Sequence, residues 1–295
     1  MAEWVKEIDE DGNILQTKKY DGKYYVSHFI GNIKDHLSAI EEMEVRDDDT
    51  FLLSYPKSGT HWVFTIASML RTRDTAYHGS PMFMDFNEME TLNNMPSPRI
   101  LATHMTFDRL PRQAREGKGK ILVALRNPKD VAVSLHTFVK KLDYSDVIAT
   151  WDGLLKFYVE GKMVYGSWFE NIQAWDKTKK EYKGDNLMFL IYEELKKDLH
   201  SHVKKIDAFL ETNTGEDYVD LVTHKCTFKN MAVEATNSFK PSDQWKTATT
   251  SKTLPIYRKG EIGDWKNHFT VAQNESFDKI YEDKMKNSSF HFMFE

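Results

Sequence analysis

Short apolar runs alternate with longer segments of helical periodicity along most of the chain. The runs are continuous, which is typical of strands that are buried on both faces of a sheet. The segments that follow place apolar residues every three or four positions, as amphipathic helices do. The units read in this way are 50–70, 99–104, 120–138 and 186–210. This alternation predicts an α/β fold with a central parallel sheet flanked by helices.

Local signals predict some of the element boundaries. Asn127 can cap a helix that starts at Pro128, because the first helical position needs no N–H donor. The strand of the fourth unit is expected to end at Tyr192. The apolar residues after it predict a single helical face, made of Leu195, Leu199, Val203, Ile206 and Leu210.

Three stretches, 74–98, 141–152 and 232–256, lack clear periodicity and contain residues that break helices and strands. Loops that leave the carboxyl ends of parallel strands build the ligand site of open α/β sheets. These stretches are therefore candidates for the walls and lid of a pocket. Since no repeat or low-complexity linker divides the sequence, we expect one domain over residues 1–295, with the N-terminal ~20 residues at its periphery.

Composition narrows the class of protein. A chain of 295 residues, 40% of them hydrophobic, can bury a sizeable core without disulfides. The net charge of −5 argues against a nucleic-acid surface, although a local basic cluster can still bind a small polyanion. With Cys226 as its one cysteine, the chain has no intrachain disulfide or cysteine-based metal site, and we expect a cytoplasmic location. No run is long and apolar enough to predict a membrane span, and the acidic N-terminus does not resemble a signal peptide.

A candidate phosphate-binding loop, YPKSGTHW at residues 55–62, lies between the first predicted strand and its helix. Backbone N–H groups at a helix N-terminus attract anions. Gly59 allows close approach of the backbone, Lys57 adds a charge, and Ser58 and Thr60 supply hydroxyl donors. The signature GxxxxGK[ST] is absent and no acidic strand end for magnesium stands out, so we expect phosphate binding without a metal. Taken alone, the loop could equally be a turn that contains a lysine.

Two further basic elements follow in the sequence. Arg126 ends the third predicted strand, where its planar guanidinium suits a phosphate, although an ion pair with Asp130 is the ordinary alternative. Arg258 and Lys259 lie in YRKGEIGDWK, residues 257–266, which is either an anion site or a solvated basic turn. Three such elements in one acidic chain favour a ligand with two phosphate-like groups.

Together these residues resemble the cytosolic sulfotransferase family. YPKSGTHW resembles the loop that holds the 5′-phosphosulfate of 3′-phosphoadenosine 5′-phosphosulfate (PAPS), RNPKDVAVS resembles the 3′-phosphate element, and RKGEIGDWKNHFT resembles the C-terminal signature. The resemblance extends from about residue 25 to residue 290. It implies a P-loop-like fold related to nucleotide kinases, and metal-independent transfer of the PAPS sulfuryl group to a hydroxyl of a small molecule, which releases 3′-phosphoadenosine 5′-phosphate (PAP).

The resemblance also implies roles for individual residues. His104, at the end of the second predicted strand, matches the general base, a role that suits a side chain with a pKa near neutrality. Lys57 would stabilise the departing PAP, and Ser134 would link the 3′-phosphate to that lysine. Trp62 and Phe228 would stack on the adenine. The nucleotide contacts implied are Lys57, Ser58, Gly59, Thr60, His61, Trp62, Arg126, Ser134, Tyr192, Thr227, Phe228, Met231, Arg258, Lys259 and Gly260.

Three departures from the family pattern keep alternatives open. Ala102 stands where many members have lysine, and His61 and Cys226 each replace a common threonine. The missing lysine leaves open a PAPS- or PAP-binding protein with little transferase activity. A nucleotide-dependent kinase of related fold is a second alternative, which would need a glycine–lysine pair and magnesium-binding carboxylates.

Apolar and aromatic residues in the breaker-rich stretches predict the acceptor. They favour a lipophilic or phenolic molecule over a charged sugar. The acceptor contacts predicted are Phe83, Met84, Phe86, Tyr144 and Trp151. The segment Lys266–Glu275 matches the family's dimerisation motif KxxxTVxxxE, which implies a homodimer, although a charged helix start is the ordinary alternative.

Overall fold

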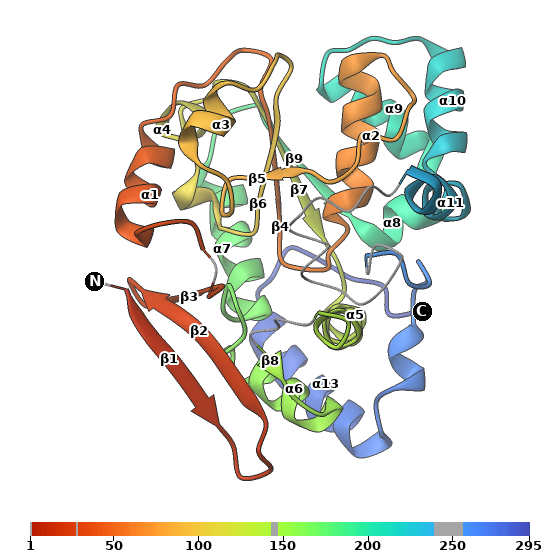
Figure 1. Cartoon of the computed structure of the whole chain (residues 1–295). Coiled ribbons are helices and arrows are strands. Elements are labelled where there is room, and N and C mark those ends of the chain that lie inside the picture. Colours follow the sequence, from red (N-terminus) through yellow and green to blue (C-terminus); the bar gives the residue numbers. More distant parts are fainter. Residues whose placement is uncertain (1, 28, 143–146, 239–255) are drawn as a thin grey trace.

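The central element of the structure is a parallel sheet of five strands (Figure 1). The structure is a computed structural model that describes residues 2–27, 29–142, 147–238 and 256–295. The strands follow the order β5-β6-β4-β7-β9, and every neighbouring pair is parallel. Their bounds are β4 Thr50–Ser54, β5 Met82–Phe83, β6 Ile100–Thr103, β7 Lys120–Leu125 and β9 Leu187–Ile191. The predicted α/β fold with a central parallel sheet is confirmed.

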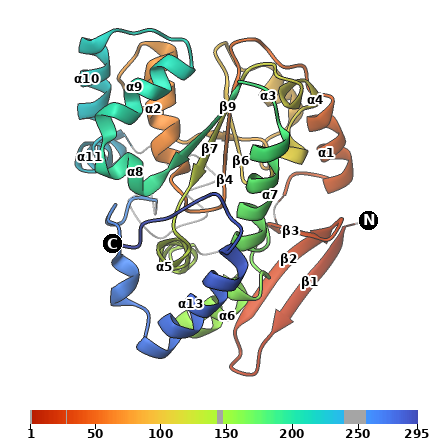
Figure 2. The ribbon, with the colours of Figure 1, turned by 180° about the vertical axis from the view of Figure 1, so that it is seen from behind.

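Helices cover both faces of this sheet (Figures 1 and 2). Helix α2 (Thr60–Thr72) follows β4 and α5 (Pro128–Val139) follows β7. The remaining helices are α1 Ile33–Glu41, α3 Met89–Asn93, α4 Arg112–Arg115, α6 Trp151–Val159, α7 Trp168–Glu181, α8 Tyr192–Lys197, α9 Leu199–Phe209, α10 Glu216–Lys225, α11 Phe228–Ser238 and α13 Val271–Met285, with 3₁₀ turns η1 Phe107–Arg109 and η2 Asp264–Asn267. None of the helices in the described part of the chain combines the length and the apolar character that crossing a bilayer requires.

Two boundaries test the local signals of the sequence. The cap at Asn127 is confirmed, because its side chain accepts a hydrogen bond from the Asp130 N–H at 2.8 Å. The apolar residues predicted over 195–210 do pack into one core cluster, but their placement on a single helix is wrong, since the chain forms two helices there, α8 and α9. Asp198 separates them, and its carboxylate caps α9 by accepting from the Ser201 N–H at 3.1 Å.

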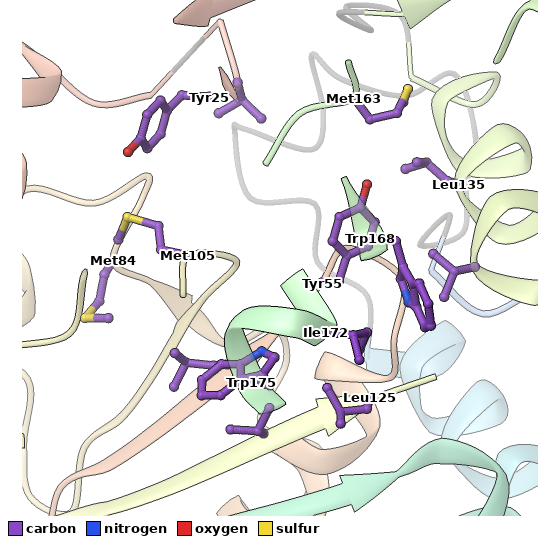
Figure 3. Packing of buried hydrophobic residues seen from close by; sticks show 14 of the residues in the cluster. Tyr25, Tyr55, Met84, Met105, Leu125, Leu135, Met163, Trp168, Ile172 and Trp175 are labelled. Atoms are coloured by element: carbon purple, nitrogen blue, oxygen red, sulfur yellow. The ribbon is translucent and has the colours of Figure 1, made fainter. Parts of the chain in front are cut away.

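Alternate residues of the central strands pack against different helices. Leu52 and Leu122 belong to a core cluster shared with α2 and α8–α10, whereas Phe51 and Ile121 belong to a larger cluster on the other face. Figure 3 shows part of the larger cluster, in which tryptophans of α7 lie near Leu125 of β7. Burial on both faces explains why these strands are continuously apolar in sequence.

A second, antiparallel sheet was not predicted. It contains β1 (Glu3–Ile8), β2 (Ile14–Tyr20), β3 (Lys23–Tyr25) and β8 (Val147–Ile148). The sequence analysis placed the first ~20 residues at the periphery of the domain and predicted no strand there, because charged residues interrupt the apolar ones in β1. Asn13, in the β1–β2 turn, fixes this sheet to α6, since its buried Oδ1 accepts from the Thr150 N–H at 2.7 Å.

Candidate active site

The carboxyl ends of β4, β6, β7 and β9 meet at one edge of the sheet, where ligands bind in open α/β folds. The loop after β4 turns sharply there. Lys57 has a φ of 70° and Gly59, which precedes the first residue of α2, has a φ of 105°. A Cβ on Gly59 would lie 3.0 Å from the ring of Tyr192, so both the backbone and the packing require glycine. The loop therefore presents the positive end of α2 at the site edge.

Lys57 lies in a strongly cationic environment. Burial first, and then the charges of Arg126, Lys141 and Arg258, lower the pKa of Lys57 to about 7. Its Nζ lies 4.0 Å from the centre of the Phe138 ring, and within the described residues it has no carboxylate partner in an ion pair. A buried lysine that lies among other cations and has no carboxylate paired with it in the described part of the chain is expected to bind an anionic ligand.

Arg126 contacts both of the other elements predicted to bind phosphate, the loop at residues 55–62 and the segment at residues 257–266. Its guanidinium stacks 4.1 Å from the centre of the Tyr192 ring and donates weak hydrogen bonds to the carbonyls of Lys57 and Glu261, at 3.4 and 3.3 Å. The predicted alternative, an ion pair with Asp130, is present only at the 4.0 Å limit. Asp130 instead accepts from the N–H groups of residues 263 and 265, at 2.9 and 3.0 Å, and so fixes that segment against α5.

One carboxylate, that of Asp264, forms ion pairs with two basic residues of the 257–266 segment. Asp264 is buried and pairs with Arg258 and with Lys259, the latter at 2.6 Å. Although burial opposes it, hydrogen bonds from Lys259, Asn267 and Arg258 hold the pKa of Asp264 well below its usual range. Gly260 has a φ of 66°, and a Cβ there would lie 2.1 Å from the Phe228 ring, so this segment packs directly on α11.

Three of the residues predicted to contact the nucleotide, Trp62, Tyr192 and Met231, share one core cluster. Trp62 donates from Nε1 to the Cys226 carbonyl at 2.8 Å, and its ring lies 5.1 Å from that of Tyr192. Met231 is buried in the same cluster, and its N–H bonds the Thr227 carbonyl at 3.0 Å, in the first turn of α11. Elements far apart in sequence thus bring these residues together. Ser134 lies on α5, half-buried, two turns from its N-terminus.

His104 follows the last residue of β6 at the same edge. Its Nδ1 lies 2.9 Å from the Ser54 carbonyl, which can only accept, so Nδ1 carries the proton and Nε2 is left as a base. Burial lowers the pKa of His104 to about 4; the hydrogen bond to Ser54 opposes this shift, and the charge of Lys57 adds to it. The imidazole is therefore neutral at physiological pH.

Aromatic rings surround His104. The Phe83 ring lies 5.0 Å from His104, 6.3 Å from His61 and 5.5 Å from Phe86, measured between ring centres. The ring of Tyr165, which the sequence analysis missed, lies 5.2 Å from that of His104. Its φ of 66° is rare for a residue with a side chain, and such conformations gather at functional sites. A Tyr-Gly pair in an irregular segment was its only sequence signal.

Two predicted acceptor contacts, Met84 and Trp151, do not join this group. Met84 is fully buried in the larger core cluster, because successive residues of β5 and its extension point to opposite sides (Figure 3). Trp151 packs between α5 and α13, where its ring lies 5.1 Å from Phe269 and its Nε1 donates to Gln273 at 3.1 Å. These positions do not support acceptor contacts for Met84 and Trp151. Tyr144 lies outside the described residues.

The chain is similar in sequence to several known proteins. The family model described as "Sulfotransferase domain" matches residues 47–289. The amine sulfotransferase of Oryctolagus cuniculus is 33% identical over 267 residues, which cover 88% of each chain. Sulfotransferase 1C2 of Homo sapiens is 33% identical over 281 residues, covering 88% of this chain and 91% of that protein.

Solved structures give the same result for the fold. The crystal structure of mouse sulfotransferase SULT7A1 complexed with PAP matches with a TM-score of 0.74 and 32% identity, over 92% of this chain and 95% of that one. Retinol dehydratase in complex with androsterone and the inactive cofactor PAP matches with a TM-score of 0.77 over 98% of this chain and 92% of that one. At 16% identity, the second likeness concerns the fold alone.

Proposed function

The chain belongs to the sulfotransferase family, and we propose that it transfers the sulfuryl group of PAPS to a hydroxyl of a small lipophilic or phenolic acceptor. Family membership rests on the match over residues 47–289 and on relatives at 33% identity. The cofactor assignment is supported by the PAP in the structure of mouse SULT7A1. The cationic cluster around Lys57 and Arg126 supplies the positive charge that such a ligand needs.

The observation that carries the proposed chemistry is the state of His104. Its Nδ1–H is committed to the Ser54 carbonyl, and its low pKa keeps Nε2 free of a proton. A neutral imidazole held in one orientation is suited to accept a proton from an acceptor hydroxyl. In the proposed step the acceptor oxygen forms a bond to sulfur, its proton moves to Nε2 of His104, and the bond between sulfur and the 5′-phosphate oxygen breaks.

The leaving PAP gains negative charge on that oxygen. We assign its stabilisation to Lys57 and the N-terminus of α2, since positive groups that are already in place cost no reorganisation in the transition state. Arg126, Ser134, Arg258, Lys259 and Gly260 are assigned to the 3′-phosphate. Trp62 and Phe228 are assigned to the adenine, together with contacts from Tyr192, Thr227 and Met231.

The acceptor class follows from the rings next to His104. Phe83, Phe86 and Tyr165 offer apolar and aromatic surface, and among the groups that shift the pKa of His104 the one charged side chain is that of Lys57. Such walls favour phenols and lipophilic alcohols over charged sugars. A panel of phenols, sterols and oligosaccharides, assayed with PAPS, tests this assignment. Transfer to oligosaccharides alone would contradict it.

Binding of PAP is the first test of the function. Calorimetric titration of the purified chain with PAP, without magnesium, is expected to give micromolar or tighter affinity, with weaker binding by Arg126→Ala and Lys259→Ala. Binding of ATP in place of PAP would favour a kinase. Tight PAP binding without transfer to any acceptor would favour a PAP-binding protein, the alternative raised by Ala102.

We also propose a single domain, a cytoplasmic location and a homodimer. The dimer is supported by the exposure of the motif residues in Lys266–Glu275, where the Val271 side chain is 76% exposed at the start of α13. A valine so exposed on the surface gains stability when a second copy covers it. An interface confined to this short motif would be small, below the usual ~1,200 Å² of stable complexes.

A further inference from the structure

A buried carboxylate without a part in the proposed chemistry lies behind the general base. The Asp85 side chain, which follows β5, is fully buried. Its Oδ1 accepts a hydrogen bond from the Thr103 hydroxyl at 3.0 Å, and its Oδ2 accepts one from the backbone N–H of His104 at 3.3 Å. Among the described residues it forms no ion pair with a cation, so neutral donors alone hold it.

The direction of these hydrogen bonds is determined. Thr103 Oγ1 also lies 3.0 Å from the Met105 N–H, which can only donate. The threonine hydroxyl accepts from Met105 and donates its own proton to Asp85, because an ionised carboxylate can only accept. Since Asp85 also accepts from the backbone of His104, one carboxylate holds Thr103 and His104 directly, and Met105 through the Thr103 hydroxyl.

Asp85 is itself held in place by backbone pairing. The Met84 N–H donates to the Ala102 carbonyl at 2.8 Å, and the Ile30 N–H donates to the Asp85 carbonyl at 3.2 Å. The carboxylate is thus fixed relative to β6. Its position cannot change without disturbing the strand that ends next to His104.

We propose that Asp85 is a positioning residue for His104: it anchors the backbone of the turn, while the Ser54 carbonyl orients the ring. This inference rests on the proposed role of His104 as general base. With two anchors, one on the main chain and one on Nδ1, the position of Nε2 relative to the acceptor hydroxyl is set. Proton transfer demands such geometry, because a small displacement of the base lowers the rate without weakening the binding of the cofactor.

The free-energy cost of burying the Asp85 carboxylate argues against a purely structural role for this residue. Burial raises the pKa of Asp85 to about 7, although the hydrogen bonds from Thr103 and from the His104 N–H oppose the shift. Burial of a carboxylate without a cation disfavours the folded state, and an apolar side chain would fill the space at lower cost. Costly buried groups of this kind concentrate at functional sites.

The test compares Asp85→Asn with the wild type in the full chain. The amide has nearly the same shape but only one acceptor oxygen, so it cannot accept from both the Thr103 hydroxyl and the His104 N–H, as the carboxylate does. We expect kcat per PAP-binding site to fall at least tenfold, with the Kd for PAP and the KM for the acceptor within about twofold of wild type. An unchanged kcat per PAP-binding site, with only a lower Tm or a smaller active fraction, would overturn the proposal.

A matched pair at Thr103 covers the case in which Asp85→Asn does not fold. Thr103→Ser keeps the hydroxyl that bridges Asp85 and Met105, whereas Thr103→Val removes it and keeps the branched shape. We expect near-wild-type kcat for Thr103→Ser and a clear loss for Thr103→Val, with PAP affinity unchanged in both. Equal kcat in the two variants would overturn the proposal.

One measurement separates failure of this inference from failure of the proposed function. ¹⁵N NMR of histidine-labelled protein reports which ring nitrogen of His104 carries the proton, without any turnover. We expect the Nδ1–H form in the wild type and in Thr103→Ser, and a mixture of forms in Asp85→Asn or Thr103→Val. If the wild type bound PAP but transferred nothing, this spectrum would still decide: identical His104 signals in all four proteins would contradict the anchoring role.

Discussion

Binding of PAP should be coupled to protonation of Lys57. In the ligand-free chain the pKa of Lys57 is lowered to about 7 by burial and by the charges of Arg126, Lys141 and Arg258. A bound polyanion reverses the effect of these charges on the pKa, because it neutralises the cations and places negative charge beside Nζ. The pKa of Lys57 in the complex should therefore return toward the ordinary value of a lysine, 10.5.

The size of the effect follows from these two values. At pH 8, about one in ten ligand-free molecules carries a protonated Lys57, whereas nearly all complexes do, so binding takes up about 0.9 proton. At pH 6 most molecules are already protonated and the uptake is about 0.1 proton. The affinity for PAP should consequently fall as the pH rises through 7, by up to about tenfold per pH unit.

Isothermal titration calorimetry measures this number directly. Titrations at pH 8 in two buffers of different ionisation enthalpy give the protons taken up per PAP bound. The phosphates of PAP, with second pKa values near ~6, are already ionised at pH 8 and contribute little. Glu193 is a second source of uptake, since burial raises its pKa to about 7 and it lies close to Arg126.

Lys57→Met is the control, because it removes the lysine proton and leaves Glu193 in place. We expect the uptake at pH 8 to drop by most of one proton in this variant. Equal uptake by the two proteins at pH 8 would refute the assignment of the proton to Lys57. An uptake in the wild type that does not change between pH 6 and pH 8 would refute it as well.

Three further predictions concern the base, the 3′-phosphate segment and the dimer. His104→Ala should lower kcat by about 100-fold or more in a PAPS assay and leave the Kd for PAP within about threefold, and near-wild-type turnover would contradict its role as base. Gly260→Ala should weaken PAP binding at least tenfold and lower Tm, because its Cβ would overlap the Phe228 ring; Gly12→Ala, with a similar φ of 77° but open space around it, is the matched control and should not affect PAP binding. Val271→Glu should convert a dimer to a monomer in size-exclusion chromatography with light scattering, and an unchanged mass would contradict an interface at the start of α13.

Features that depend on neighbouring residues in the sequence could be predicted. The continuous apolar runs predicted β4, β6, β7 and β9, because burial on both faces leaves no polar alternation, whereas the two-residue β5 lies in a stretch without periodicity and was missed. Asn127 and Pro128 predicted the start of α5, since a cap is made by residues two or three positions apart. The order of strand, loop and helix at residues 50–72 likewise placed Lys57 and Gly59 at a helix N-terminus.

Contacts between distant segments could not be predicted in this way. The two-helix division at Asp198 was missed, because the apolar period continues across the break. The N-terminal sheet was missed, since its turn is fixed by Asn13 to a residue more than a hundred positions away. Met84 was expected beside Phe83 in one pocket, and the pleat of the chain places it in the core instead.

The same distinction applies to the site. By itself, the sequence determined which chemical groups the chain carries at the ends of its strands: Lys57, His104 and Arg126, each next to a recognisable run or motif. Only the tertiary structure decided how these side chains are protonated and oriented. The pKa of Lys57 depends on cations from three other segments, the free nitrogen of His104 depends on a carbonyl of a neighbouring strand, and Asp85 acquires its partners only when β5 and β6 pair. Protonation and orientation depend on burial and on contacts across the sheet, and those exist only once the chain has folded.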